Sequence, residues 1–442
     1  MKVSNWGNYP VAEAEVRSFG TSAEAAEVMR SSSELIPRGL GRCYGDSSLS
    51  SNILSTLKFN RFLEFDRENG ILHCQSGVSL EEILKVVVPA GFFLPVTPGT
   101  KYVTIGGAIA ADVHGKNHHS EGSFSAHVLE LNLLAPDGQL YHCSRQENAD
   151  LFWATCGGMG LTGLVLDVRF RLKRIETAYI VEEATKVKNV DALYKLFEES
   201  MHFTYSVAWI DCLARGNNLG RAVLYNGEHA LKSDLQKPKQ RENPLILPAK
   251  RKIALPFKLP SFTINPLTVK VLNSMVYGKA KSGMHRHVVD YDTYFYPLDG
   301  ILHWNRAYGK KGFAQYQFAI PPSTSYDGMV RILKEISNAR QPSFLSVLKY
   351  FGKGENGPLA FPMEGYMLAL DFPITKSLFP FLDRLDEIVM ECRGRIYLTK
   401  DSRMKPEVLQ RGYPRLQEFL DIKSRIDGGK QMQSLQSKRI GI

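Results

Sequence analysis

The chain has 442 residues, of which 44% are hydrophobic and 23% charged, so it is long enough for two globular domains and is neither disordered nor collagen-like. The sequence has no apolar run of about 18 residues and no apolar core near its first residue, so we expect neither a membrane-spanning helix nor a secretory signal. The net charge is +10, and residues 221–300 carry 13 Lys and Arg against 6 Asp and Glu, which favours an anionic partner. Six scattered cysteines without a CxxC pair predict reduced thiols in a cytoplasmic protein.

Periodic segments alternate with loops along the chain. The capping pattern Thr/Ser-x-x-Glu begins at Thr21 and again at Ser79, and each occurrence predicts a helix that starts directly after it. Residues 166–173 alternate apolar and charged side chains, which predicts a half-buried strand. Further on, the periodicity predicts helices over 326–339 and 378–392 and strands over 366–372 and 395–400. Residues 226–286 show little periodicity, which is typical of a lid or a disordered segment.

Glycine-rich loops crowd the first third of the chain, at 38–46, 98–111, 114–119 and 156–163. Glycine lets the backbone approach a ligand closely, so that successive N–H groups can converge on phosphate oxygens. Any one loop could be a plain turn, but the four together predict a long cofactor that lies across them. The small side chains of Ala108, Ala110 and Ala111 would give a flat ring a smooth floor. The first loop lacks the GxGxxG spacing, which argues against a Rossmann fold.

The segment PGT…TIGGAIAADVHGKNHHSEGSF (98–124), with RGLGRCYGD (38–46) and GLTG (160–163), resembles the FAD-linked oxidases of the vanillyl-alcohol-oxidase type, which have a PCMH-type FAD-binding domain. The resemblance continues through WNRAYG (304–309), QYQF (315–318), DFPI (371–374) and YLTKDSR (397–403), and so covers nearly the whole chain. It implies a two-domain α+β flavoprotein. The FAD-binding domain would comprise 1–178 with a C-terminal return at 395–442, and 179–394 would form an antiparallel-sheet substrate domain.

The resemblance also implies roles for individual residues. The implied cofactor contacts are Arg38, Gly39, Leu40, Gly41, Arg42, Cys43, Tyr44, Gly45, Asp46, Gly99, Thr100, Thr104, Ile105, Gly106, Gly107, His114, Gly115, Asn117, Val165 and Tyr397. The implied substrate contacts are His114, Lys116, Gln315, Gln317, Lys349 and Tyr397, and the implied catalytic residues are Lys400 and Tyr44.

The implied reaction oxidises the 2′-hydroxyl of a polyprenyl-phosphoryl ribose to the 2′-keto sugar, as the first half of an epimerisation that makes an arabinose donor for the cell wall. A short-chain NAD-dependent reductase would complete it. FAD would take the hydride, while a desolvated Lys400 or Tyr44 handles the hydroxyl proton. The sequence does not decide between these two residues. Without the resemblance, Lys400 could equally form a surface ion pair, and Gln315 and Gln317 could face solvent.

Several positions qualify the resemblance. Cys43 stands where the wider superfamily often carries the histidine that is bonded to the flavin, so we expect non-covalent FAD. Met159, Met367 and Ala369 depart from the expected residues and loosen the assignment of substrate. We expect no metal site, because no Cys or Glu near His114 completes a ligand set. Trp304 is expected in the core.

The basic, apolar region 226–286 suits a substrate with a greasy tail and an anionic head, and we expect peripheral contact with the inner face of the cell membrane, although a periplasmic location stays open. A disordered surface loop is the alternative. A soluble sugar-alcohol or aldonolactone oxidase on the same fold would need no such region. Binding of nucleic acid is not expected, because the region has no recognised nucleic-acid-binding motif.

Overall fold

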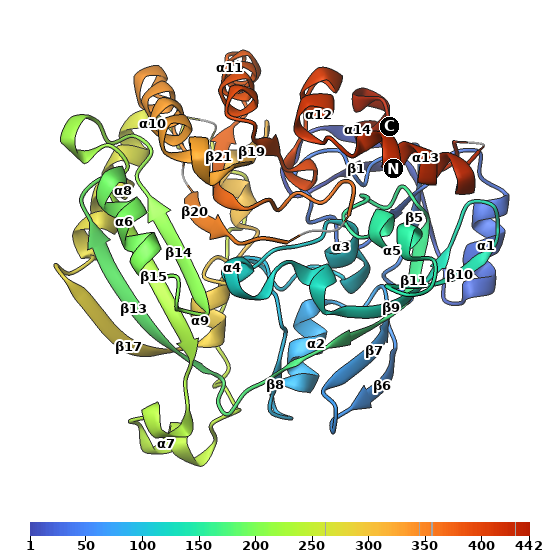
Figure 1. Ribbon diagram of the computed structural model, residues 1–442, viewed down its shortest axis with the longest axis horizontal. Coiled ribbons are helices and arrows are strands. Elements are labelled where there is room, and N and C mark those ends of the chain that lie inside the picture. Colours follow the sequence, from blue (N-terminus) through green and yellow to red (C-terminus); the bar gives the residue numbers. More distant parts are fainter. Residues whose placement is uncertain (261, 344, 355–356, 429) are drawn as a thin grey trace.

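Two antiparallel sheets, one in each half of the molecule, organise the fold (Figure 1). The computed structural model describes residues 1–260, 262–343, 345–354, 357–428 and 430–442. The sheet of the first half has the strand order β10 (Leu140–Ser144), β9 (Val128–Leu134), β11 (Leu164–Arg171), β7 (Ile71–Gln75) and β6 (Phe62–Asp66). A smaller parallel sheet in the same half contains β3 (Glu15–Ser18), β5 (Asn52–Ser55) and β4 (Ile36–Arg38).

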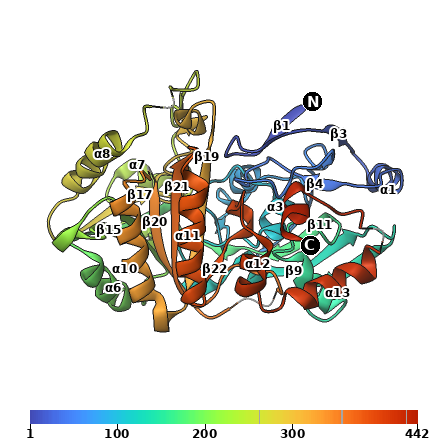
Figure 2. The same ribbon diagram turned by 90° about the horizontal axis from the view of Figure 1, so that it is seen from above.

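The second half contains a larger sheet that supplies one wall of the site described below. Its strand order is β17 (Met284–Asp290), β13 (Tyr179–Val187), β15 (Ala222–His229), β14 (Tyr205–Ile210), β20 (Ser346–Phe351), β21 (Gly365–Pro373), β19 (Phe313–Ile320) and β22 (Arg395–Ile396). Helices α6 (Val190–Glu199), α10 (Pro322–Ala339) and α11 (Leu378–Glu391) pack against it (Figure 2). On β19, Tyr316 hydrogen-bonds to Asp386 of α11, so the alternate residues Gln315 and Gln317 face away from that helix.

Further helices and strand pairs complete the two halves. The first half adds helices α1 (Ser22–Arg30), α2 (Leu80–Val87), α3 (Ile105–Ala110), α4 (His118–Glu121) and α5 (Ala149–Thr155). The second half adds α7 (Pro238–Glu242), α8 (Pro266–Lys279) and α9 (Tyr291–Phe295). Two-stranded pairs are β1 (Lys2–Ser4) with β2 (Val11–Glu13), β8 (Phe92–Phe93) with β12 (Lys173–Arg174), and β16 (Ile253–Ala254) with β18 (Ile301–Leu302). The α+β class expected from the sequence is confirmed.

Both capping signals in the sequence are confirmed. The Thr21 side chain accepts a hydrogen bond from the Glu24 N–H at the start of α1. At α2 the box is complete, because Ser79 accepts from the Glu82 N–H and Glu82 accepts from the Ser79 N–H at 2.8 Å. The strands and helices expected near 166–173, 326–339, 366–372 and 378–392 also form, with ends shifted by a few residues.

Two expectations about secondary structure were wrong. The strand predicted over 395–400 ends at Ile396, and a 3₁₀ turn follows at Leu398–Lys400, because the Tyr397 side chain crosses to the Ala111 carbonyl of the first half at 2.6 Å. The region 226–286 is not an irregular loop throughout, since it contains the 14-residue helix α8. Asn265 caps α8, and apolar residues lie on more than one face of it, which hides the helical period.

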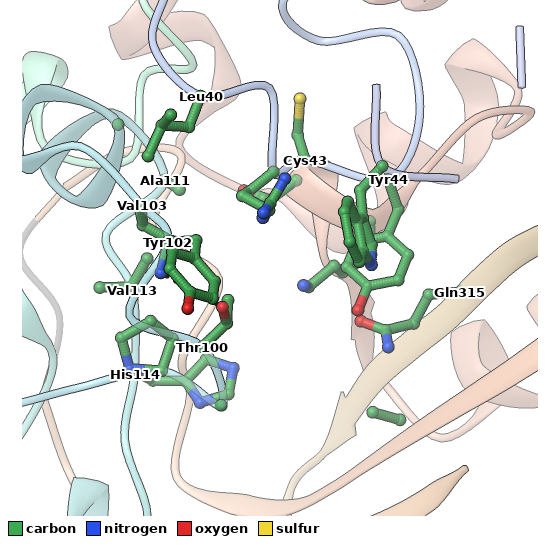
Figure 3. Close-up of a pocket in the computed structure, with 18 of the residues that line it drawn as sticks. Leu40, Cys43, Tyr44, Thr100, Tyr102, Val103, Ala111, Val113, His114 and Gln315 are labelled. Atoms are coloured by element: carbon green, nitrogen blue, oxygen red, sulfur yellow. Dashed lines mark hydrogen bonds between the residues drawn. The ribbon is translucent and has the colours of Figure 1, made fainter. Parts of the chain in front are cut away.

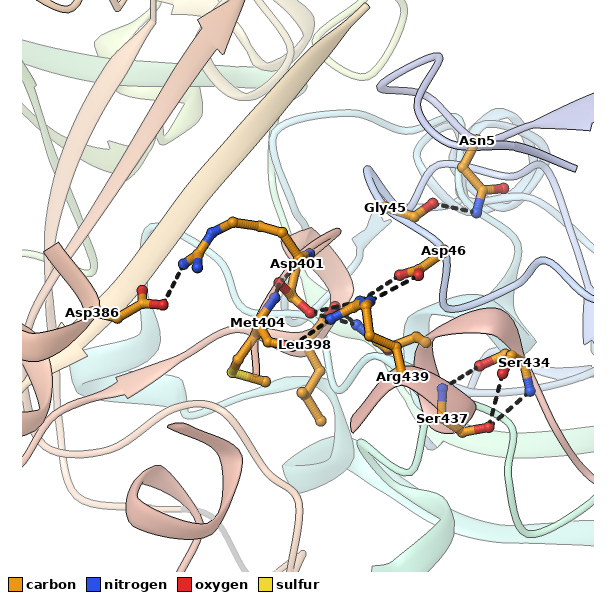
Figure 4. Close-up of polar contacts among 12 residues, drawn as sticks. Asn5, Gly45, Asp46, Asp386, Leu398, Asp401, Met404, Ser434, Ser437 and Arg439 are labelled. Atoms are coloured by element: carbon orange, nitrogen blue, oxygen red, sulfur yellow. Dashed lines mark hydrogen bonds and ion pairs between the residues drawn. The ribbon is translucent and has the colours of Figure 1, made fainter. Parts of the chain in front are cut away.

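The C-terminal return contains α12 (Pro406–Gly412), α13 (Leu416–Ile426) and α14 (Leu435–Ile440) and lies beside the first half (Figures 1 and 2). Helix α13 packs against α5, and Met432 pairs with Leu35 just before β4. Arg439 of α14 pairs with Asp46 at 2.7 Å and with Asp401 at 2.9 Å (Figure 4). The Tyr44 N–H also donates to the Thr399 carbonyl at 3.0 Å. These contacts fix the segment around Lys400 against the 38–46 loop. Within the described residues, no helix has the length and apolar character needed to cross a bilayer.

Candidate active site

A cavity of about 890 Å³ lies where the two halves and the C-terminal return meet. Its lining comes from the 38–46 and 98–116 loops, from β13, β14, β19, β20 and β21, from α8, and from the segment that ends at Lys400. Figure 3 shows Leu40, Ala111 and His114 on one side of it and Tyr44 with Gln315 on the other. This volume is at the upper end of the range for ligand pockets and has room for a large cofactor beside a substrate head group.

Glycine backbone forms one wall of the cavity. Gly39, Gly41, Gly99, Gly106 and Gly107 all line it, as do the predicted floor residues at 110 and 111, whereas Ala108 is buried behind them. A Cβ at Gly39 would lie 2.1 Å from Thr104 Oγ1, so glycine lets the two loops pack tightly. A Cβ at Gly99 would meet nothing within 4 Å, so the open space begins directly at that backbone.

His114 gives a direct test of whether a cofactor fits this wall. The Gln317 amide nitrogen donates to His114 Nε2 at 2.7 Å, so the ring proton lies on Nδ1, which is buried and has no hydrogen-bond partner among the described residues. Burial holds the pKa of His114 well below its ordinary value and keeps the ring neutral. His114 lines the cavity among the glycines, and a neutral ring there suits a ligand with ring nitrogens and carbonyls, as a flavin has, so the residues present fit FAD.

Three lysines from separate segments of the chain line the same cavity. Burial lowers the pKa of Lys116 to about 7, and Glu182 opposes that shift. Burial also lowers the pKa of Lys349 to about 7, and repulsion from Lys116 and Lys400 adds to it. The pKa of Lys400 falls to about 8 through burial, with Asp371 opposing. All three side chains line the same cavity, and Lys349 lies within electrostatic reach of the other two, so an anion bound there would stabilise their charged forms.

Lys400 and Tyr44, the two alternatives for the proton acceptor, lie together in the cavity. The Lys400 Nζ is 4.0 Å from the centre of the Tyr44 ring, and the Phe313 ring packs edge-on against the same ring. Burial raises the pKa of Tyr44 well above its ordinary value. Asp401 and Arg403 are engaged elsewhere, with Arg439 and with Asp383 and Asp386, so the surface ion pair considered for Lys400 is wrong.

Most of the predicted site residues line the cavity. The lining includes Arg38, Gly39, Leu40, Gly41, Arg42, Cys43, Tyr44, Gly99, Thr100, Thr104, Gly106, Gly107, His114, Lys116, Val165, Gln315, Gln317, Lys349, Tyr397 and Lys400. Gln315 and Gln317 are buried rather than solvent-facing. Tyr397 presents its ring, since its hydroxyl is already bound to a backbone carbonyl.

Five predicted cofactor contacts lie outside the lining. Gly45 packs against the Asp401 backbone, and Asp46 pairs with Arg439. Ile105 is fully buried in the core. Gly115 packs against Thr97, and Asn117 donates to the Pro95 carbonyl at 2.8 Å. These residues hold the lining loops in place from behind, so a direct contact with the cofactor stays a prediction for them.

The sequence also missed part of the lining. Trp304 is half-buried and lines the cavity rather than sitting in the core. Glu182, Trp209, Tyr225, Tyr294 and Asp299 line it as well. Asp299 accepts hydrogen bonds from Thr100 Oγ1 at 2.7 Å and from the Lys101 N–H at 2.9 Å, which ties the second half to the glycine wall. No sequence motif marks these residues, because each is a single residue on its own element: Glu182, Trp209 and Tyr225 lie on strands, whereas Tyr294, Asp299 and Trp304 lie on short helices or in a turn.

Across the part of the chain that the structure describes, no three His, Cys, Asp or Glu side chains are grouped to hold a metal ion. His118 is buried against the Phe351 ring, and His119 hydrogen-bonds to the Phe203 carbonyl at 2.7 Å. All six cysteines lie in the described residues and none is paired.

Comparison with known proteins agrees with this geometry. Residues 13–144 match the family described as the FAD binding domain. Decaprenylphosphoryl-β-D-ribose oxidase of Mycolicibacterium smegmatis is 38% identical over 399 residues, which cover 89% of this chain and 86% of that protein. An uncharacterized protein in the mprA 5′ region of Streptomyces coelicolor is 32% identical over 83% of this chain and 100% of its own length. L-gulonolactone oxidase of Mus musculus is 28% identical over 32% of this chain. The chain therefore belongs to the family of decaprenylphosphoryl-β-D-ribose oxidases and is an FAD-dependent oxidoreductase.

Proposed function

We propose that the protein oxidises the 2′-hydroxyl of a polyprenyl-phosphoryl ribose to the 2′-keto sugar, as the first half of an epimerisation that yields an arabinose donor for the cell wall. The observation that carries this proposal is the cluster of Lys116, Lys349 and Lys400 in the same cavity as the glycine wall. A neutral sugar alcohol or lactone has no charge to offset three desolvated cations, whereas a phosphorylated sugar has one.

Lys116 and Lys349 would hold the phosphate head. Lys116 Nζ donates to the Tyr294 carbonyl and lies 3.9 Å from the centre of the Tyr294 ring, which fixes its direction. An ammonium with a pKa near 7 gains most from an anion, because binding restores the charge that burial disfavours. The two lysines therefore suit a phosphodiester better than a sugar hydroxyl.

Lys400 is the proton acceptor that we favour over Tyr44. A general base works best when its pKa lies near the working pH, and the pKa of Lys400 is about 8. The raised pKa of Tyr44 keeps its phenol protonated, so Tyr44 can position the hydroxyl but does not accept its proton.

The glycine wall would hold the cofactor, with Gly39, Gly41, Gly106 and Gly107 offering backbone and His114 offering its free N–H. FAD, when bound, supplies the two-electron acceptor for the hydride.

We propose that the cofactor is bound without a covalent link, because residue 43 is a cysteine whose Sγ lies 3.1 Å from Ser48 Oγ. Acid denaturation is then expected to leave all the flavin in the supernatant, and flavin retained in the pellet would contradict it.

An apolar flank of the cavity would accept the start of the prenyl chain. Leu272 and Val276 of α8 line it together with Ile301, Leu302 and Trp304. On its outer face, α8 exposes Leu267, Val271 and Met275 by 71%, 54% and 53%. The same helix thus contributes to the cavity and to the protein surface, and the prenyl tail could pass from one to the other.

That outer face supports the proposal of peripheral membrane contact. Between Glu242 and Asp290 the sequence has no acidic residue, while its basic residues are Lys250, Arg251, Lys252, Lys258, Lys270, Lys279, Lys281 and Arg286. Exposed apolar residues flanked by cations suit an anionic lipid surface.

A partner enzyme is part of the same proposal. A short-chain NAD-dependent reductase would take the 2′-keto product, since epimerisation needs a reduction after the oxidation.

The domain limits also remain a proposal: 1–178 and 395–442 for the FAD-binding domain and 179–394 for the substrate domain. The large sheet starts at Tyr179, and the ion pair of Arg439 with Asp46 of the first half supports this division.

The decisive experiment is anaerobic mixing of the FAD-loaded protein with farnesyl-phosphoryl ribose while flavin absorbance is followed. We expect bleaching, and no bleaching by free ribose, a sugar alcohol or an aldonolactone at the same concentration. Bleaching by the aldonolactone but not by the lipid-linked sugar would replace this proposal with a soluble lactone oxidase.

Membrane contact is tested by flotation with vesicles of phosphatidylglycerol or phosphatidylcholine at low salt. We expect binding to the anionic vesicles only, and its loss in the triple variant Leu267→Glu, Val271→Glu, Met275→Glu. Leu140→Glu, which changes an apolar residue that is 62% exposed on β10, is the matched control. Equal flotation of the triple variant and the control variant would refute the assignment of this face.

A further inference from the structure

Asp371 is a buried carboxyl group that the proposed reaction does not yet use. It lies on β21 opposite Gln315 of β19, and it has no solvent-exposed surface. The Gln315 amide nitrogen donates to Asp371 Oδ1 at 2.5 Å. The other oxygen, Oδ2, has no hydrogen-bond partner among the described residues. Burying a carboxylate whose second oxygen has no hydrogen-bond partner costs folding free energy. A residue kept beside the cavity at that cost is a candidate for a functional role.

The groups around Asp371 come from three other elements. Lys400 approaches from the C-terminal return, Tyr44 from the 38–46 loop and Tyr308 from the 3₁₀ helix Trp304–Tyr308. Gln315 joins the carboxyl to Tyr44, with which it shares a side-chain hydrogen bond. Lys400 is the one cation that acts on Asp371 among the described residues. Lys400 in turn faces Lys349, His114 and Cys43.

We propose that Asp371 is a positioning residue whose carboxylate stands behind Lys400 and neutralises the ammonium that forms when Lys400 takes the substrate's hydroxyl proton. In that step the O–H bond of the substrate breaks and an N–H bond forms on Lys400. The C–H bond of the carbon that bears this hydroxyl also breaks, and its hydride is transferred to FAD. Asp371 keeps its own charge, so the loaded pair is neutral overall. Through Gln315 the same carboxylate fixes the Tyr44 side chain against which Lys400 packs. This inference rests on the proposed function.

The electrostatics agree with this arrangement. Burial raises the pKa of Asp371 to about 7, and Lys400 opposes that shift. Asp371 likewise opposes the fall in the pKa of Lys400. Removing the carboxylate should therefore lower the pKa of Lys400 further and make it a weaker base, although more of it would be neutral at pH 7.

The test measures individual lysine pKa values in the FAD-loaded protein, by competitive acetic anhydride labelling across pH with mass spectrometry. In Asp371→Asn we expect the labelling midpoint of Lys400 to move to lower pH by about one pH unit, while that of Lys116 stays. Glu182→Gln is the crossed control, because Glu182 is the acid that acts on Lys116. It should move Lys116 and leave Lys400 unchanged. An unmoved Lys400 midpoint in Asp371→Asn overturns the proposal.

A second readout separates this role from mere support of the fold. The rate of flavin bleaching by farnesyl-phosphoryl ribose should rise with pH through the Lys400 midpoint. Asp371→Asn should move that rise to lower pH and lower the plateau at least tenfold, with little change in the half-saturating substrate concentration. An equal loss of rate at every pH contradicts the proposal. If wild-type protein is not bleached at all, the proposed function fails, while the labelling result still decides the role of Asp371.

If Asp371→Asn does not fold, a variant of Lys400 tests the electrostatic coupling between Asp371 and Lys400 from the other side. Lys400→Met changes a cavity-facing residue, and it should raise the pH at which the infrared band of the protonated Asp371 carboxyl disappears. An unchanged band contradicts the coupling.

Discussion

The two walls of the cavity are built in different ways. One is continuous backbone from the 38–46 and 98–116 loops, with glycine where the chain meets open space. The other consists of single side chains from separate strands, such as Gln317 on β19 and Lys349 on β20, with Lys400 arriving from the C-terminal return. The backbone wall offers neutral donors that suit a resident cofactor. The side-chain wall offers cations with lowered pKa values, which suit a charged ligand that binds and leaves.

The largest difference between the tasks of the two walls is expected in a variant of Lys400. Lys400→Ala should slow flavin bleaching by farnesyl-phosphoryl ribose by about 1000-fold, since it removes the proton acceptor. FAD content should stay at the wild-type level, because the glycine wall is intact. Lys405→Ala, at an exposed ion pair with Asp383, is the matched control and should leave the rate unchanged. Loss of FAD from Lys400→Ala would show that the two walls do not have separate tasks.

The converse variant is Gly99→Val. Its side chain would project into open space rather than into protein, so the apoprotein should keep its melting temperature. The protein should retain less than about a tenth of its flavin, because the valine occupies cofactor volume. Flavin content by absorbance and apoprotein melting are the measurements. Full flavin retention would remove Gly99 from the cofactor wall.

Lys116→Gln and Lys349→Gln probe the anion site. Each should weaken the binding of the phosphorylated substrate by about tenfold, with little effect on FAD. Both lysines have a pKa near 7, and anion binding needs their protonated forms, so affinity in the wild type should fall as pH rises above 7. Half-saturation measured from pH 6 to pH 9 checks this sign. Affinity that does not change with pH would argue that neither lysine meets the phosphate.

The smallest effect on the rate of flavin bleaching is expected from changes to the ion pairs that hold the C-terminal return (395–442) in place. Arg439→Met should cost about 2–3 kcal/mol in the free energy of unfolding, allowing for the partial exposure of Arg439. Arg439 is one of the charges that lower the pKa of Asp401, so the contribution of Asp401 is present above pH 4 and is lost as pH falls through its folded value. Denaturant unfolding at pH 7 and pH 3 measures both. A variant as stable as wild type at pH 7 would show that the return is held by other contacts.

The difference between the backbone wall and the side-chain wall also explains which parts of the site could be predicted from the sequence. The glycine loops and the caps at Thr21 and Ser79 are local signals, so the backbone wall was largely predicted from the residues themselves. The lysine wall was predicted through the family resemblance. Glu182 was missed even so, because a single alternate position on strand β13 carries no motif, and Asp299 was missed because a lone residue in the turn after α9 carries none either. Helix α8 was missed since its apolar residues divide between the cavity and the surface.

The central claim is that the flavin lies against the glycine wall with Lys400 on its substrate side. A crystal structure of the FAD-loaded protein tests it most directly. We predict that the isoalloxazine packs against residues 98–116 and that Lys400 Nζ faces its reactive side within reach of a bound sugar hydroxyl. An isoalloxazine bound elsewhere, or a Lys400 turned away from it, would contradict the account.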